Sequence, residues 1–145
     1  MDDISYMQLA FEQAKLAYKK DEVPVGAIIV YQNKVIAASH NTNISDNNPL
    51  NHAEINVINQ AAKYLKTRYL DECTLYVSLE PCMMCTGAIL NAKIKRVFFS
   101  CFDLEYGAII SNQFYKDTKK INWIPGLLKN ESSELLKKYF ENKRG

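Results

Sequence analysis

The sequence predicts an α/β protein in which helices cover both faces of a central sheet. Two observations carry this prediction. Four short apolar segments have the composition of buried strands, and four longer segments repeat apolar residues at the helical period. The two kinds of segment alternate along the chain, which is typical of a sheet with helical connections. A length of 145 residues fits one domain spanning residues 1–145 with a sizeable core.

The first half of the chain predicts a helix and then a hairpin. Residues 4–20 carry a broad apolar face, which predicts the helix. Residues 25–31 and 34–40 read as two strands around a turn at Gln32 and Asn33.

The second half continues the alternation. Residues 52–66 and 82–93 predict helices, and residues 73–79 and 95–101 predict buried strands. Residues 131–143 predict an amphipathic helix at the C-terminal end.

Two segments fall outside this pattern. The polar stretch 41–50 predicts a turn-rich loop. The segment 103–130 shows no period that assigns it to a helix or a strand.

Composition narrows the class of protein. Four cysteines in this length are too few for a disulfide scaffold. No run of about 18 apolar residues is present, and the first residues lack the basic and apolar regions of a signal peptide. We therefore expect a cytoplasmic protein that does not span a membrane.

Charge is distributed unevenly. The net charge is +2, but residues 116–145 carry eight basic and four acidic residues, or +4, which leaves −2 for the rest. A basic end can contact a polyanion. It is equally consistent with a solvated surface helix.

Two short motifs carry the chemistry. "HAE" at 52–54 and "PCMMC" at 81–85 both fall at the start of a predicted helix. Cys82 and Cys85 are three positions apart, so their side chains lie on one side of a helix whose N-terminus favours thiolates. His52 can supply a third ligand, and sulfur with imidazole suits zinc.

Three protein ligands with an open fourth position are the pattern of a catalytic zinc, which lowers the pKa of its water towards neutrality. Glu54 is two residues from His52 and is not needed as a ligand. It is therefore expected to carry protons beside the metal.

Three other interpretations of these residues remain open. They could be unrelated and merely packed, although an HxE motif followed by PCxxC, both at helix starts, argues against this. The two cysteines could be a redox couple, although such a couple needs no accompanying HxE motif. The zinc could instead be structural, with a fourth ligand from His40, Cys73 or Cys101. Cys73 and Cys101 lie in apolar strands and read as core residues.

The motifs resemble a known superfamily. "NHAEINVI" and "LEPCMMCTGAIL" resemble the zinc-dependent nucleobase deaminases, whose signature is H-x-E followed by P-C-x-x-C. "AKLAYKKDEVPVGAIIV", "HNTN", "AKIKRVFFSCFDLEYGA" and "KKYFENKR" resemble the bacterial tRNA wobble adenosine deaminases, which make inosine at the first anticodon position. The resemblance covers nearly the whole chain.

The resemblance implies a cytidine-deaminase-like fold, with three α/β/α layers and a central five-stranded mixed sheet. It also implies one Zn²⁺ per subunit, a homodimer, and a tRNA anticodon stem-loop bound near the subunit boundary. His52, Cys82 and Cys85 match the zinc ligands, and Glu54 matches the general acid/base.

The resemblance further implies a set of substrate-binding residues. Asn41 matches an asparagine that hydrogen-bonds the purine, and Asp103 matches an aspartate near the substrate backbone or sugar. The remaining positions of this set, which wall the pocket or line the nucleotide groove, are Pro49, Leu50, Ala53 and Asn122. Candidate phosphate contacts, each equally consistent with a surface charge, are Lys93, Lys95, Arg96, Lys143 and Arg144.

The chain departs from the family in the loop around Asp103 and in the segment after Asn122, which is shorter and reaches Pro125 early. Phe102 stands where the family often has a basic residue, and Glu105 places a negative charge where a phosphate would pass. Deamination of a free base or nucleoside, such as guanine or cytosine, is therefore an alternative. An inactive RNA-binding module stabilised by zinc is a second alternative, but a structural site has no use for Glu54.

Overall fold

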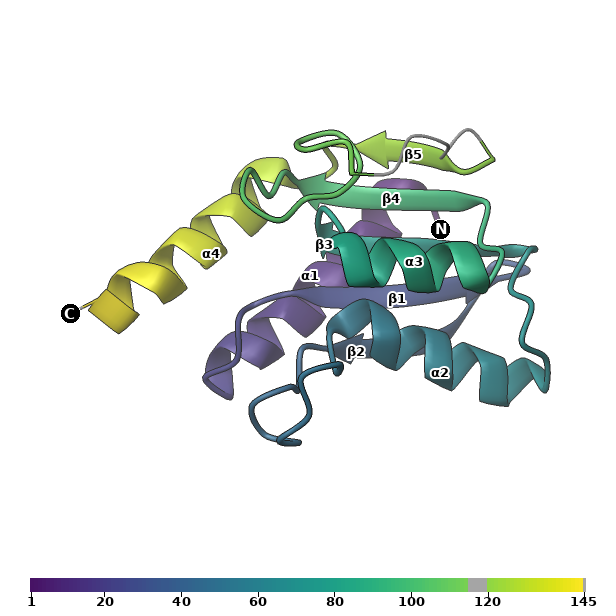
Figure 1. Ribbon diagram of the computed structural model, residues 1–145, viewed down its shortest axis with the longest axis horizontal. Helices are drawn as coiled ribbons and strands as arrows, with labels where there is room; N and C mark the ends of the chain where they lie inside the picture. Colours follow the sequence, from purple (N-terminus) through teal and green to yellow (C-terminus); the bar gives the residue numbers. More distant parts are fainter. Residues whose placement is uncertain (115–119, 145) are drawn as a thin grey trace.

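The computed structural model describes residues 1–114 and 120–144, and within them a five-stranded sheet runs in the order β2-β1-β3-β4-β5 (Figure 1). The strands are β1 (Gly26–Tyr31), β2 (Lys34–His40), β3 (Cys73–Leu79), β4 (Arg96–Cys101) and β5 (Asn122–Pro125). β1 pairs antiparallel with β2 and β3, whereas the pairs β3–β4 and β4–β5 are parallel. The mixed sheet expected from the sequence is therefore confirmed.

Helices cover both faces of this sheet. α2 (Ala53–Leu65) and α3 (Met83–Asn91) lie on one face, and α1 (Asp3–Lys19) and α4 (Lys129–Arg144) contact the other (Figure 1). The three-layer α/β/α architecture is as predicted. Among the described residues, no helix is both long enough and apolar enough to span a membrane.

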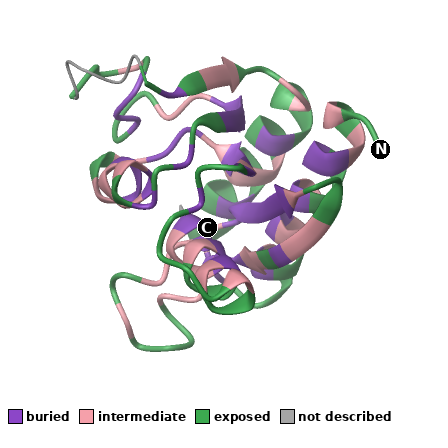
Figure 2. Ribbon diagram, turned by 90° about the vertical axis from the view of Figure 1, so that its right-hand side faces the viewer, coloured by how far each residue is buried: buried purple, intermediate pink, exposed green. Residues whose placement is uncertain are grey.

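The alternation of side chains along β1 divides the core into two parts. Ala27 and Ile29 pack towards α2 and α3, whereas Ile28 and Val30 pack towards α1. Figure 2 shows that the buried residues concentrate along the strands between the helical layers. A strand buried on both faces explains why β1 is apolar at almost every position.

β5 has no counterpart among the strands predicted from the sequence. Its four residues are too few to show a period, and its last residue is Pro125. A proline is tolerated there because β5 is an edge strand with one unpaired side.

The ends of two strands and the starts of two helices meet at one edge of the sheet and create the site. The parallel strands β3 and β4 end at Leu79 and Cys101, so the segments that follow them leave at the same edge. The N-termini of α2 and α3 lie there too, preceded by His52 and Cys82. Crevices outside the carboxyl ends of parallel strands are common binding sites in α/β proteins.

Candidate metal and nucleotide site

Two helix N-termini position the side chains that could bind a metal. His52 is the N-cap of α2, and Cys82 is the N-cap of α3, both with extended backbone. The sequence predicts Cys82 inside the helix, but α3 begins one residue later, at Met83. The Nδ1 atom of His52 lies 3.8 Å from the Cys82 sulfur and 3.5 Å from that of Cys85.

The donor set fits a zinc ion. The ligand atoms of His52, Cys82 and Cys85 all lie within 4.8 Å of one another. Two sulfurs and an imidazole nitrogen are ligands that zinc prefers. Among the described residues, this group includes none of the other candidate ligands, His40, Cys73 and Cys101. A group of three candidate ligands is the number that a catalytic zinc site takes from the protein.

The protonation of the two thiols differs. A hydrogen bond from Cys85, together with the nearby His52, lowers the pKa of Cys82 to about 4. The same hydrogen bond and burial raise the pKa of Cys85. One thiolate is therefore already present at neutral pH, and metal binding would displace the remaining thiol proton.

Glu54 is a buried carboxyl at the base of the cavity. It lies in the first turn of α2 and is only 4% exposed. Burial, and then the charge of Cys82, raise its pKa to about 7. A carboxyl with a pKa near neutrality can both accept and release a proton under cellular conditions.

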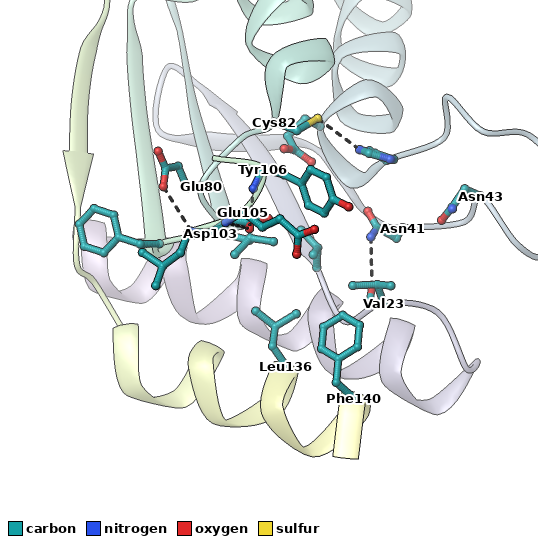
Figure 3. Close-up of a pocket in the computed structure, with 16 residues that line it drawn as sticks. Val23, Asn41, Asn43, Glu80, Cys82, Asp103, Glu105, Tyr106, Leu136 and Phe140 are labelled. Carbon is teal, nitrogen blue, oxygen red and sulfur yellow. Dashed lines mark hydrogen bonds between the residues drawn. The ribbon is translucent and has the colours of Figure 1, made fainter. Parts of the chain in front are cut away.

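These groups open into a cavity of about 550 Å³. The side chains of His52, Glu54 and Cys82 line its base. Figure 3 shows Leu136 and Phe140 rising from α4 on the side opposite Cys82, with Asp103, Glu105 and Tyr106 forming another wall. The cavity has the size of pockets that hold small organic ligands.

Asn41 lies in this cavity, as expected for a base-binding residue. Its Oδ1 accepts a hydrogen bond of 2.8 Å from the backbone N–H of Ala53, and its Nδ2 donates to the carbonyl of Val23 over 3.2 Å. One amide hydrogen and one lone pair remain for a ligand. Ala53 itself points into the core, so its backbone rather than its side chain supports the site.

The other expected substrate residues are placed differently. Asp103 lines the cavity, and its Oδ1 accepts from the backbone N–H groups of Glu105 and Tyr106. Leu50 lines a second hollow beside α3 rather than this cavity, and Pro49 is exposed and lines neither of the two.

Asn122 is not brought to the cavity, contrary to the expectation from the resemblance. It begins β5 and pairs with Arg96, the first residue of β4. Because the two strands are parallel, their first residues lie at the edge of the sheet opposite the site.

Four of the candidate phosphate contacts, Lys93, Lys95, Arg96 and Lys143, do not line the cavity. Lys93 and Lys95 precede β4 at the far edge of the sheet, where Arg96 forms an ion pair of 3.7 Å with Asp3. On α4, Lys143 forms an ion pair of 2.6 Å with Asp21. The side chain of Arg144 lies outside the described residues. The phosphates of a bound RNA can lie outside this cavity, so the phosphate contacts stay a prediction.

Several cavity residues escaped the sequence analysis. They come from loops and from the C-terminal helix, and they are Val23, Asn43, Glu80, Tyr106, Leu136 and Phe140. Leu136 and Phe140 are four positions apart on the amphipathic helix, so periodicity indicated a shared face but not what that face covers. Glu80 precedes "PCMMC" directly, which was the available signal for it.

Comparison with known proteins assigns the family. The family model of the MafB19-like deaminases matches residues 1–144, so the chain belongs to the deaminases. A tRNA-specific adenosine deaminase from Rickettsia typhi is 40% identical over 144 residues, which cover 95% of this chain and 97% of the relative. The corresponding protein from Aquifex aeolicus is 39% identical over 96% of this chain and 94% of its own. At these identities the chain is a member of the tRNA-specific adenosine deaminase family.

A solved structure supports the same assignment. It comes from a study of A-to-I editing by tRNA A34 deaminases at the wobble position of transfer RNA. It is 38% identical to this chain, covers 90% of it and 98% of its own, and superimposes with a TM-score of 0.86.

Proposed function

We propose that the protein is a zinc-dependent hydrolase that converts adenosine to inosine at the first anticodon position of tRNA. The observation that carries this proposal is the His52–Cys82–Cys85 group, which lies beside the buried Glu54 at the base of a nucleoside-sized cavity. Relatives with 40% identity that are named tRNA-specific adenosine deaminases support the choice of substrate. The substrate in turn implies a cytoplasmic enzyme, and the family match over residues 1–144 supports a single deaminase domain.

His52, Cys82 and Cys85 would hold one zinc ion per subunit. The bound metal supplies a water of lowered pKa and a positive charge for the oxygen that adds to C6 of adenine. Glu54 would accept a proton from the attacking water and pass it to the ring nitrogen, and would then move the second proton of the same oxygen to the departing amine. Adenosine and water thereby give inosine and ammonia.

The cavity walls fit an unpaired nucleoside. The remaining donor and acceptor of Asn41 can contact the base, and the apolar side chains of Val23, Leu136 and Phe140 exclude water from it. A base inside a duplex must leave its stack to enter such a pocket. An anticodon loop presents a base that is already unpaired, so this cost is lowered.

A homodimer completes the proposal. The second hollow, of about 970 Å³, is lined mainly by apolar side chains beside α3, and Cys82, Glu105 and Tyr106 line both hollows. Leu50 and Met83 are more than half exposed there. A second copy of this chain on the α3 face would bury them and border the reaction cavity, and sedimentation would detect it.

An inosine assay tests the proposed reaction. Purified zinc-loaded protein is incubated with an anticodon stem-loop that has adenosine at the first anticodon position, and nucleosides are then analysed by mass spectrometry. We expect inosine at that position. Glu54→Ala is the blank, and we expect it to keep its zinc and fold while activity falls by about 10²–10⁴-fold. Full activity of this variant would remove Glu54 from the mechanism.

Parallel substrates decide between the alternatives. Ammonia from free guanine, cytosine or adenosine, without inosine in the stem-loop, would keep the zinc chemistry and overturn the substrate. Stem-loop binding with no turnover of any substrate would favour the RNA-binding module.

A further inference from the structure

A second buried carboxylate, which the proposed chemistry does not use, lies beside the site. Glu80 follows β3 at the edge of the sheet and is 2% exposed. Among the described residues, it forms no salt bridge with a basic side chain. Burying a carboxylate charge destabilises the folded state unless hydrogen bonds compensate it. The hydrogen-bond donors around Glu80 therefore show what this carboxylate does.

The hydrogen-bond partners of the Glu80 carboxylate all come from one loop. Its Oε2 accepts hydrogen bonds from the backbone N–H groups of Ile109, Ile110 and Ser111, over 3.2, 2.8 and 3.0 Å. Its Oε1 accepts from the N–H of Asp103 over 3.2 Å and from the hydroxyl of Ser111. One carboxylate therefore fixes both ends of the segment 103–111, which contains neither helix nor strand.

The loop is built to approach this carboxylate closely. A Cβ added to Gly107 would lie 2.3 Å from Oε1 of Glu80 and 2.5 Å from the carbonyl oxygen of Asp103. A Cβ atom essentially never comes this close to an atom to which it is not bonded. A side chain at Gly107 would therefore force Glu80 and the loop apart.

The first part of the loop, residues 103–106, forms a wall of the cavity. Asp103, Leu104, Glu105 and Tyr106 all line it, and Figure 3 shows the hydrogen bond that joins Glu80 to Asp103. The Nδ2 of Asn112 closes the loop by donating to the carbonyls of residues 104, 105 and 107. Glu80 thus holds this wall in place before any ligand arrives.

We propose that Glu80 is a positioning residue for the substrate nucleotide, acting through the loop 103–111. A preordered wall avoids the entropy cost of ordering the loop on binding. Glu80 does not touch the reacting atoms, so its loss weakens binding of the ground state and the transition state alike. Such a loss raises KM and leaves kcat nearly unchanged. The inference rests on the proposed deamination. It adds that Glu80, through the loop 103–111, sets the affinity of the enzyme for its substrate.

Glu80→Gln tests this role, because a glutamine amide has one acceptor oxygen and its NH₂ group faces N–H donors of the loop. We expect KM for the anticodon stem-loop to rise about tenfold while kcat changes less than about twofold. Zinc content should stay at the wild-type value. Glu72→Gln is the matched control, since Glu72 is exposed just before β3 at the other edge of the sheet.

Hydrogen exchange provides a readout that needs no substrate. The amides of Ile109, Ile110 and Ser111 should exchange slowly in the wild type and faster in Glu80→Gln, with the amides of β3 unchanged. If Glu80→Gln fails to fold, Ser111→Ala replaces it, because that variant removes one donor and keeps the carboxylate. We expect Ser111→Ala to raise KM about two- to threefold.

The outcomes separate clearly. An unchanged KM in folded Glu80→Gln, or in Ser111→Ala where the first variant does not fold, would overturn the positioning role. Unchanged exchange in the tested variant would overturn it as well. A fall in active fraction at constant KM would show a role in stability alone and would also overturn it. If the proposed function itself is wrong, the wild type forms no inosine. The hydrogen-exchange result would still decide whether Glu80 fixes the loop 103–111.

Discussion

The four cysteines differ most in their thiol pKa. The pKa of Cys82 is about 4, whereas burial raises the pKa of Cys73 to about 11 and that of Cys101 to about 12. The thiolate is the reactive form. A pH of 6 is above the pKa of Cys82, so this thiol is deprotonated. The same pH is far below the pKa values of Cys73 and Cys101, so those thiols are protonated.

We therefore expect iodoacetamide at pH 6 to alkylate Cys82 first in the metal-free protein. Zinc should protect it, because coordination occupies the sulfur. Peptide mapping by mass spectrometry would identify the modified residue. Faster modification of Cys73 or Cys101 would contradict the assignment of Cys82 as the thiolate.

At the same scale, the sequence indicated which candidate metal and proton-transfer residues would lie together, but it did not indicate most of the residues that line the cavity around them. His52, Glu54, Cys82 and Cys85 stand in motifs whose spacing is set by local helix geometry, which a sequence shows directly. Leu136 reaches the cavity only through the packing of α4, and Glu80 reaches the 103–111 loop only through the tertiary fold. Neither arrangement leaves a local pattern.

Among the elements, α1 and β1 make an unusually close contact. A Cβ at Gly26 would lie 2.1 Å from the carbonyl oxygen of Ala10 and 2.3 Å from the backbone nitrogen of Ala14. Both are backbone atoms of α1, so no side chain can move aside. Gly26 therefore lets the helix lie directly over the start of the strand.

We expect Gly26→Ala to lower the free energy of unfolding by about 1–3 kcal/mol or more, because overpacking displaces the helix. Gln8→Ala on the exposed side of α1 is the control and should stay within about 0.5 kcal/mol of the wild type. Urea denaturation followed by circular dichroism would measure both. A Gly26→Ala variant as stable as the wild type would show that α1 is free to shift.

The boundaries of the long helices and strands were predicted to within two or three residues, because each of these elements carries a full apolar period. α1 was expected over 4–20 and spans Asp3–Lys19, and β3 was expected over 73–79 and spans Cys73–Leu79. β5 was missed because its pairing with β4, and not its own four residues, makes it a strand.

For the whole molecule, the metal group joins parts of the chain that are distant in sequence. His52 and the two cysteines come from different helices on one face of the sheet, so they converge only in the folded state. A metal that binds the folded state and not the unfolded chain adds to stability.

Zinc should therefore raise the free energy of unfolding, by about 4 kcal/mol when free zinc is 1,000-fold above its dissociation constant. Denaturation at several buffered zinc concentrations would measure the gain. Cys85→Ser should show little of it, and an equal gain in that variant would remove Cys85 from the ligands.

The two sides of the cavity are held in place differently, and this difference gives the molecule a capacity for evolutionary change. The metal group and Glu54 are attached to helix starts that are packed into the core. The facing wall, by contrast, is a loop that binds Glu80 through backbone amides and the Ser111 hydroxyl, and not through the exposed side chains of residues 104–106. Substitutions at positions 104–106 can therefore alter which molecule is recognised while the reaction centre and the loop's own anchorage stay intact. The departures from the family pattern at Phe102 and Glu105 lie in or beside this adaptable part of the protein.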